Sequence, residues 1–391
     1  MNRGIMKKIE DIILQSERDN DEKYERYMSV LAGKRAFALF GAGREGVKVA
    51  ERFAKDFPDK FLFFVDNDAG KQGREIVPGI YCWSPEKMKE YCADELAVLN
   101  TTLFYVAEIQ TCIEGLGLSG CLVPPLLEDP CRRGFASFLY RAGNARLYAS
   151  HLTEIQEVAN LFADDESRNA FAGAIKCRVS DENLAGELLS LPQYFPSEIR
   201  ELLGRDEVFY DCGAYIGDTT EAFQEQTMGN FRAVYAFEMD PSIFKQLESN
   251  QRLKDARISI FPFGVSNCNG AVEFTPMVEG EGSSYAIRFS GKLIASAVAQ
   301  LRSLDTLEKD GVVAEPATFV KMDIEGAEMD ALQGMKQMIM QYKPKLAICV
   351  YHKPEDLWEI PLFIHKLVPE YKLILRQHSP LMDNDTVLYA F

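Results

Sequence analysis

The 391-residue sequence predicts an α/β protein with two main parts, a smaller N-terminal domain and a C-terminal seven-stranded, doubly wound sheet with one antiparallel strand. Three observations lead to this fold class. Short apolar strands alternate with segments of helical period along the C-terminal half, and a glycine-rich turn joins a strand to a helix at two places. The interval between Arg376 and Asp385 is too short for a helix, so the last two strands form a hairpin and one of them is antiparallel.

Changes in pattern along the chain predict four segments, namely a helical segment over 1–32, a Rossmann-like domain of the nucleotide-binding type over 33–129, a helical connector over 130–205 and the large sheet domain over 206–391. The N-terminal domain has predicted strands at 35–40 and 61–65. The C-terminal domain has predicted strands at 207–211, 233–238, 257–262, 317–323, 345–351, 371–376 and 385–391. Its predicted helices are 217–227, 241–252, 328–341 and 354–367.

The composition is that of a folded, soluble chain. Hydrophobic residues make up 47% of the chain and charged residues 26%, which excludes a disordered or fibrous protein. With 43 Lys and Arg against 59 Asp and Glu, the formal net charge is −16, and such a surface repels nucleic-acid phosphates and anionic lipid. No apolar run approaches the roughly 20 residues that a transmembrane helix needs. We therefore expect no nucleic-acid partner and no membrane span.

Cysteine usage and the N-terminus indicate a cytoplasmic protein. The nine cysteines include no C-x-x-C pair, and the four histidines do not complete a zinc site with them, so reduced thiols are expected. Residues 1–31 alternate charged and apolar side chains, which a signal peptide does not do.

A glycine-rich turn follows the first predicted strand. Gly41, Gly43 and Gly46 have the G-x-G-x-x-G spacing where a strand gives way to a helix, and Asp66 ends the next strand. The glycines let the backbone approach a ligand, the helix N–H groups and Arg44 favour a phosphate, and the acid can hold a ribose. These five residues predict a nucleotide or nucleotide-sugar site. The alternative is that the glycines only allow close packing of helix and strand.

A second glycine-rich turn has the opposite charge. Gly213 and Gly217 follow the first strand of the C-terminal domain, but Asp211 and Asp218 flank them, and the next strand ends in Glu238. Carboxylates at a helix N-terminus oppose a pyrophosphate, whereas they suit a ligand with an ammonium and a sulfonium group. S-adenosylmethionine is such a ligand, and Glu238 can accept hydrogen bonds from its ribose. The alternative is an N-capping acid with structural glycines.

Five motifs, in this order, resemble the FkbM-type methyltransferases. They are Asp211-Cys-Gly-Ala-Tyr-Ile-Gly-Asp218, Phe237-Glu-Met-Asp-Pro241, Phe263-Gly-Val-Ser-Asn267, Ser303-Leu-Asp305 and Phe319-Val-Lys-Met-Asp-Ile-Glu-Gly-Ala-Glu328. The resemblance covers residues 190–391, and the lead-in Gln193-Tyr-Phe195 is similar to that of bacterial members with an extra N-terminal Rossmann-like domain. It implies a class I methyltransferase-like sheet and S-adenosylmethionine as the methyl donor.

The resemblance also implies which residues bind the cofactor. Asp211 takes the methionyl ammonium, Glu238 holds the ribose, and the residues after the third strand flank the adenine. The implied set is Asp211, Gly213, Ala214, Gly217, Asp218, Thr219, Glu238, Asp240, Phe263, Gly264 and Val265.

The acceptor chemistry is expected beyond the carboxyl ends of the fourth and fifth strands, because ligands of doubly wound sheets lie there. Asp323 and Glu325 follow the fourth strand, and His352 follows the fifth. A histidine suits proton removal near neutrality, with Asp323 or Glu325 assisting. Structural interpretations are also open: His352 is a residue at the entry of a helix, and Glu325 shapes the turn before Gly326. A further acid, Glu328, supports the first turn of the next helix. A divalent ion held by Asp323, Glu325 and His352 is an alternative, although no metal is predicted.

These features predict an S-adenosylmethionine-dependent methyltransferase that modifies a hydroxyl of a sugar, glycan precursor or polyketide-like small molecule. Its partner is a small-molecule or glycan-type acceptor, with a nucleotide or nucleotide-sugar at the N-terminal domain. Two alternatives are an NAD- or nucleotide-sugar-dependent enzyme run by the N-terminal turn, and a non-catalytic nucleotide-binding scaffold. No Tyr-x-x-x-Lys pair stands beside the N-terminal turn, which argues against the NAD- or nucleotide-sugar-dependent enzyme. The intact acids of the C-terminal glycine turn argue against the non-catalytic scaffold.

Overall fold

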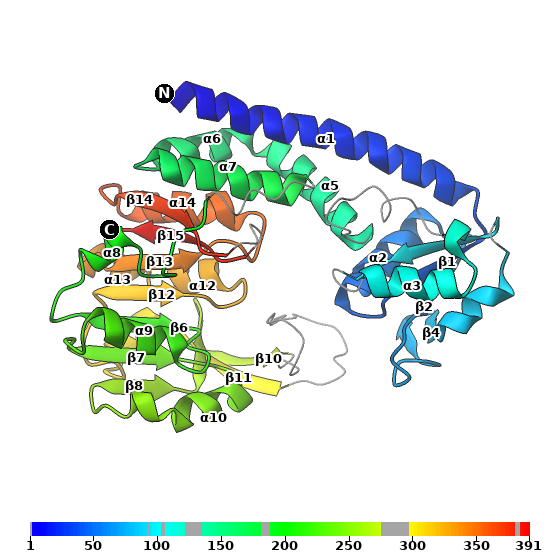
Figure 1. The fold of residues 1–391 in the computed structure, drawn as a ribbon. Coiled ribbons are helices and arrows are strands. Elements are labelled where there is room, and N and C mark those ends of the chain that lie inside the picture. The colour runs from blue at the N-terminus through cyan, green and yellow to red at the C-terminus, as the bar shows by residue number, and fades with distance from the viewer. Residues whose placement is uncertain are drawn as a thin grey trace. The chain divides into compact units, whose positions relative to one another are not determined.

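The computed structural model describes residues 2–92, 94–102, 106–121, 135–180, 188–274, 297–379 and 384–391. Its chain divides into two compact units (Figure 1). One, here called the C-terminal unit, comprises Met1–Met6, Thr153–Ala174 and Asn183–Phe391, and the other, the N-terminal unit, comprises Lys7–Leu152 and Ile175–Glu182. Parts of the predicted segments, at 122–134 and 181–187, lie outside the described residues. Within the described part, no helix is both long and apolar enough to cross a membrane.

The N-terminal unit is an α/β domain, as predicted, with a five-stranded sheet in the order β3-β4-β2-β1-β5. Its strands are β1 (Ala36–Phe40), β2 (Phe61–Val65), β3 (Glu75–Val77), β4 (Ile80–Trp83) and β5 (Leu96–Asn100). Its helical elements are most of α1 (Asn2–Ala32), α2 (Arg44–Asp56), η1 (Pro85–Glu90), α3 (Val106–Gly115), η2 (Ser119–Cys121) and α5 (Phe135–Ser150). β1 is parallel to both β2 and β5, and β4 is parallel to β2, while β3 is antiparallel to β4. β3, β4 and β5 were not predicted, and β3 and β4, with three and four residues, are too short to show a period.

The predicted helical connector contains α6 (Leu152–Leu161), α7 (Asp165–Val179) and α8 (Ser197–Arg200). Arg376, from the edge of the large sheet, attaches this part of the chain. Its nearly buried guanidinium donates to Asp164 Oδ2 at 2.9 Å and to Ser167 Oγ at 2.8 Å, and it pairs with Glu198. Because a guanidinium removed from water needs such partners, Arg376 fixes Asp164, Ser167 and Glu198 to the sheet.

The C-terminal unit contains the predicted seven-stranded sheet, in the order β14-β15-β13-β12-β6-β7-β8. Its strands are β6 (Val208–Cys212), β7 (Ala233–Phe237), β8 (Ile258–Phe261), β12 (Phe319–Met322), β13 (Lys345–Cys349), β14 (Leu373–Gln377) and β15 (Thr386–Ala390). β15 is antiparallel to β13 and β14, and every other neighbouring pair is parallel. The fold class and the single antiparallel strand are therefore confirmed.

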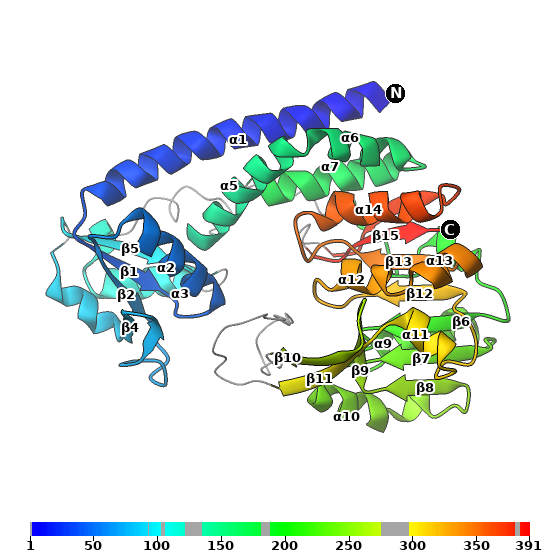
Figure 2. The ribbon, with the colours of Figure 1, turned by 180° about the vertical axis from the view of Figure 1, so that it is seen from behind.

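Helices cover both faces of this sheet. They are α9 (Asp218–Gln226), α10 (Pro241–Ser249), η4 (Gln251–Leu253), α11 (Leu304–Lys309), α12 (Glu328–Gln333), α13 (Lys336–Tyr342) and α14 (Asp356–Leu367). α9 lies over the face seen in Figure 1, and α11 and α13 lie over the opposite face, seen in Figure 2. The single helix predicted over 328–341 is divided at Gly334, where a Cβ would stand 1.9 Å from the carbonyl oxygen of Ser266.

A three-stranded sheet with the order β10-β11-β9 was not predicted. It consists of β9 (Phe263–Val265), β10 (Gly270–Phe274) and β11 (Ala297–Arg302). β10 and β11 alternate buried and exposed side chains, so each has one apolar face, and these faces form a small separate core. The alternation of buried and exposed side chains in β10 and β11 is present in the sequence, but five or six residues are too few for it to predict a strand.

Parallel pairing brings four carboxyl ends together. β7, β6, β12 and β13 are adjacent and parallel, so the residues that follow them lie along one edge of the sheet. An aromatic core packs the amino ends of β6 and β12 against α9: the ring centroids of Phe209 and Phe223 are 4.5 Å apart, and that of Phe319 lies 5.1 Å from that of Phe209. The sheet thus carries the predicted cofactor turn and the predicted acceptor groups on one rigid edge.

Candidate active site

The turn between β6 and α9 depends on its glycines. Gly213 has φ +79°, and a Cβ on it would stand 1.9 Å from the carbonyl oxygen of Asp323. Gly217 has φ +95° and forms the N-cap of α9. Tyr215, between them, also has a positive φ of +49°. The turn is therefore held in a conformation and at a distance from β12 that other residues cannot reproduce without strain.

Glu238 links this turn to the end of β7. Its Oε2 accepts the backbone N–H of Tyr215 at 3.1 Å, and its Oε1 accepts that of Asp240 at 2.8 Å. The side chain is almost fully buried, and burial raises its pKa to about 7, although the two N–H donors act in the opposite direction. Each carboxylate oxygen keeps capacity for a further donor, as ribose hydroxyls would require.

The other predicted cofactor residues lie around the same turn. Asp218 is exposed at the first position of α9, Ala214 and Thr219 are buried, and Asp240 caps α10 by accepting the N–H of Ser242 at 2.7 Å. Asp240 is therefore the N-capping acid of α10, whereas the N-cap of α9 is Gly217, which has no side-chain cap.

The residues predicted to flank the adenine form β9. Phe263 packs its ring 5.8 Å from that of Phe237, at the end of β7. A Cβ on Gly264 would lie 3.2 Å from the sulfur of Met239, so this strand lies close to the loop after β7. The structure therefore brings Phe263, Gly264 and Val265 near the residue that follows Glu238 in the chain.

Asp211 has an unexpected partner. The side chain is fully buried, its Oδ2 accepts the hydroxyl of Thr220 at 2.7 Å, and its Oδ1 lies 3.1 Å from Nζ of Lys321. Lys321 belongs to the fifth sequence motif but was given no role there, although a lysine inside the apolar strand Phe319–Met322 has to find a counter-ion.

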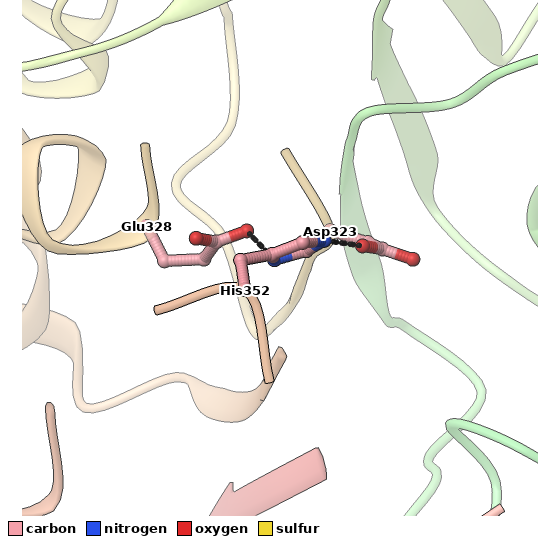
Figure 3. Close-up of side chains that lie close together, drawn as sticks. All are labelled: Asp323, Glu328 and His352. Atoms are coloured by element: carbon pink, nitrogen blue, oxygen red, sulfur yellow. Dashed lines mark ion pairs between the residues drawn. The ribbon is translucent and has the colours of Figure 1, made fainter. Parts of the chain in front are cut away.

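His352 lies between carboxylates, as Figure 3 shows. Its Nδ1 is 2.9 Å from Oε1 of Glu328, and its Nε2 is 3.5 Å from both Asp323 Oδ1 and Glu325 Oε2. Burial alone would lower the pKa of this imidazole, but Glu328, and then Asp323 and Glu325, raise it to about 9. The three residues predicted to carry the acceptor chemistry are thus brought together, and His352 is cationic near neutrality.

Glu328 has two partners. Its fully buried carboxylate accepts the backbone N–H of Ile324 at 2.9 Å, which supports the turn before α12, and it also faces His352. The structural role foreseen for Glu328 and a role in orienting the imidazole are therefore compatible.

Asp323 is kept ionised by its surroundings. The hydroxyl of Tyr194 donates to Oδ2 at 2.7 Å, and that of Tyr351 donates to Oδ1 at 3.1 Å. Burial acts to raise the pKa of Asp323, but the charges of Lys321 and His352 and these hydrogen bonds together lower it. Tyr194 comes from the segment before the sheet, and no local pattern assigned it to the site.

Asp323, Glu328 and His352 also offer ligand atoms within 4.8 Å of one another. In Figure 3, however, the imidazole lies between the two carboxylates, so that Glu328 faces one ring nitrogen and Asp323 faces the other. The contacts drawn are those of a cationic imidazole between two acids.

The N-terminal glycine turn has a different construction. The Oδ2 of Asp66 accepts the backbone N–H of Ala42 at 2.9 Å and lies 3.1 Å from Nζ of Lys71. Gly41 has φ +112°, and a Cβ on Gly46 would lie 2.0 Å from the carbonyl oxygen of Gly41. These two glycines serve the packing of the turn. A Cβ on Gly43 would meet nothing within 4 Å, and the side chain of Arg44 lies outside the described part.

The turn after β6 has the features that S-adenosylmethionine requires. The acids Asp218 and Glu238 border it, as suits a cationic ligand without phosphate, and the missing Cβ atoms of Gly213 and Gly217 let the turn pack closely against Asp323 and Leu253. The ends of β12 and β13, with Asp323 and His352, lie next to it on the same edge. The residues present therefore fit the methyl donor.

Comparisons with known proteins agree with this site. Residues 211–376 match the model of the methyltransferase FkbM domain. A hexuronic acid methyltransferase from Haloferax volcanii is 28% identical over 183 residues, which are 47% of this chain and 70% of that protein. The crystal structure of a methyltransferase FkbM from Methylobacillus flagellatus superposes with a TM-score of 0.56 at 21% identity, over 98% of this chain and 99% of the other, and shows the same fold. Residues 211–376 are thus similar to methyltransferase FkbM domains, and the chain shares its fold with such a methyltransferase.

Proposed function

We propose that the protein methylates a hydroxyl oxygen of a sugar or glycan precursor and that His352 removes the hydroxyl proton. The observation that carries this proposal is the placement of the imidazole, which Glu328 contacts at Nδ1 while Nε2 faces Asp323 and Glu325. A carboxylate on Nδ1 sets the tautomer and leaves Nε2 to accept a proton. The sugar class is supported by the Haloferax volcanii relative, which is named for a hexuronic acid.

The chemistry divides between the cofactor and the chain. S-adenosylmethionine supplies a methyl group on a sulfonium, which leaves as a neutral thioether. The chain aligns the acceptor oxygen with that methyl carbon, and Nε2 of neutral His352 takes the proton as the oxygen–carbon bond forms. Asp323 and Glu325 then stabilise the imidazolium, which releases the proton to solvent after the product leaves.

The relative's name leaves a second acceptor group to consider, because a hexuronic acid also has a carboxylate. A carboxylate is already ionised at neutral pH and needs no base. A screen of methyl transfer from labelled S-adenosylmethionine to neutral sugars, uronic acids and their methyl esters tests this. Labelling of neutral sugars and of the esters supports a hydroxyl acceptor, and labelling of free uronic acids alone contradicts it.

Cofactor binding should depend on Glu238. We expect S-adenosylhomocysteine to bind the intact protein, and Glu238→Ala to weaken binding by roughly 1–3 kcal/mol, the cost of losing charge-assisted hydrogen bonds. With a pKa of about 7 for Glu238, the ionised acceptor is lost as pH falls, so wild-type affinity should decline below pH 7 and that of Glu238→Gln should not. Isothermal titration calorimetry between pH 5.5 and 8.5 measures both. Absence of binding by the wild-type protein would remove the basis of the proposed function.

A second candidate function concerns the N-terminal unit, for which we propose a nucleotide or nucleotide-sugar site at Gly41, Gly43, Arg44, Gly46 and Asp66. Its sheet order places β1 between β2 and β5, and in such sheets ligands lie at the carboxyl ends where the strand order reverses. Packing accounts for Gly41 and Gly46 but not for Gly43, over which a ligand has open space.

Calorimetry of the full chain with UDP and ADP tests this site. We expect binding by the wild-type protein and its loss in Gly43→Val, because the new side chain fills the space over the turn. Gly115→Val, at the end of α3, is the matched control, since a Cβ there also meets nothing within 4 Å. Equal binding by both variants, or no binding at all, would leave the turn with a packing role.

A further inference from the structure

Lys321 is an ammonium group almost completely removed from water. It lies in the buried strand β12, its relative exposure is 3%, and its backbone is in register with Asp211 on β6. Burial alone would lower the pKa of this lysine, but the charges of Asp211 and Asp323 and the hydrogen bond to Asp211 together raise it, while burial raises the pKa of Asp211. Such a buried pair contributes little to stability compared with apolar side chains of the same volume, so another role is worth seeking for it.

The ammonium has a further contact, with the cofactor turn. Lys321 Nζ donates to the carbonyl oxygen of Gly213 at 2.6 Å. The backbone N–H groups of Gly213 and Ala214 both donate to the carbonyl oxygen of Phe237 at 3.0 Å. The peptide of the turn is thus held from both sides, by the next strand through its N–H groups and by Lys321 through its carbonyl.

The same ammonium acts on the acceptor side of the site. Lys321 and Asp323 are two residues apart at the end of β12, so their side chains leave the same face, and the charge of Lys321 lowers the pKa of Asp323. The ring of Tyr194, which donates its hydroxyl to Asp323, has the Lys321 ammonium 5.4 Å from its centroid. The buried ammonium therefore contacts the cofactor turn directly and the acceptor side through Tyr194.

We propose that Asp211 and Lys321 form a positioning pair, in which Asp211 holds Lys321, and Lys321 fixes the Gly213 carbonyl and packs against the ring of Tyr194, whose hydroxyl donates to Asp323. In this proposal Asp211, whose carboxylate is fully buried between Lys321 and Thr220, acts on the cofactor through the turn and does not take the methionyl ammonium directly. The inference deepens the proposed function and rests on it in one respect, that the Gly213 turn is the cofactor site.

The test removes both charges at once, because a single change would leave the other charge buried and unpaired. In Asp211→Asn/Lys321→Met the side-chain shapes are nearly kept while the contact to the Gly213 carbonyl is lost. We expect affinity for S-adenosylhomocysteine, measured by calorimetry on the full chain, to fall about tenfold or more, as the loss of a charged hydrogen bond implies. Thermal unfolding reports whether the double variant is folded.

A matched control is available at the opposite end of the sheet. Lys345 of β13 pairs with Glu207, just before β6, at 2.9 Å, and both side chains are largely buried. Glu207→Gln/Lys345→Met removes a comparable ion pair away from the strand ends that carry the site. We expect it to change stability and to leave affinity for S-adenosylhomocysteine unchanged.

A second readout separates positioning from a purely structural role. The chain has four histidines, so the His352 ring can be followed by NMR, and its signal reports the protonation of Asp323 at 3.5 Å. In the wild-type protein we expect no step in that signal between pH 4 and 6. In the double variant we expect one near pH 4–5, as Asp323 returns toward its ordinary pKa.

The outcomes discriminate. Weaker binding by the double variant together with the new step in the His352 signal supports the pair. Higher affinity in the single variant Lys321→Arg, which keeps Asp211 and a cation at position 321, than in the double variant supports it further. Wild-type affinity in the folded double variant, or an equal loss in the control pair, overturns the inference. If the wild-type protein itself fails to bind S-adenosylhomocysteine, the proposed function fails instead.

Discussion

Replacing His352 with alanine should lower the rate of methyl transfer by about 10²–10⁴-fold while affinity for the cofactor stays nearly unchanged, because the variant loses the base and keeps the turn after β6. With a pKa of about 9, the imidazole is mainly protonated in the free protein at pH 7, and only its neutral form accepts a proton. We therefore expect kcat/KM of the wild-type protein to rise up to tenfold per pH unit below 9 and to level off above it. Single-turnover transfer across pH, with the acceptor found in the sugar screen, measures both effects.

Controls make this result specific. His365→Ala, on α14, removes a histidine of the same unit outside the cluster and should leave the profile unchanged. Glu328→Gln should move the rise of the profile to lower pH, since the largest contribution that raises the pKa of His352 would be gone. A flat profile from pH 6 to 9 with wild-type rates in His352→Ala would show that the base is a carboxylate such as Asp323, whose pKa is lowered, or that the acceptor needs no base.

Replacing Gly213 with alanine should have the second large effect. The new Cβ would stand 1.9 Å from a backbone oxygen of Asp323, so a strand or the turn has to move, and a misplacement of about 1 Å is enough to cost about 100-fold in activity. Calorimetry should show weaker binding of S-adenosylhomocysteine, and chemical denaturation a lower free energy of unfolding.

Gly229→Ala separates the causes of that effect. Gly229 also has a positive φ, +71°, but a Cβ on it would meet nothing within 4 Å. It therefore reports the cost of the left-handed backbone alone, about 1 kcal/mol, without the collision. Equal losses in the two variants would mean that the close approach of the turn to β12 is unimportant.

Local pattern in the sequence was sufficient for the frame of the site. Buried strands interrupted by helices of period 3.6 specify a doubly wound sheet, and the short interval after Arg376 specifies its antiparallel strand, because both signals are contained within about ten residues. The glycines at 213 and 217 and the acid at 238 were likewise visible, since the turn geometry that requires them is local. Parallel strands then place such residues on one edge.

Contacts between distant segments were decided by the tertiary structure. Tyr194 reaches Asp323 across 129 positions and Lys321 reaches Asp211 across 110, and neither partner is implied by its own neighbours in sequence. The same holds for the charge of His352, since an imidazole has an ordinary pKa until burial and three acids from the β12 side surround it. Strand order sets these distances, and protonation follows from distance and burial. The sequence by itself therefore determined the fold class and the position of the cofactor turn, while only the folded sheet decided which groups are paired and which of them can exchange a proton.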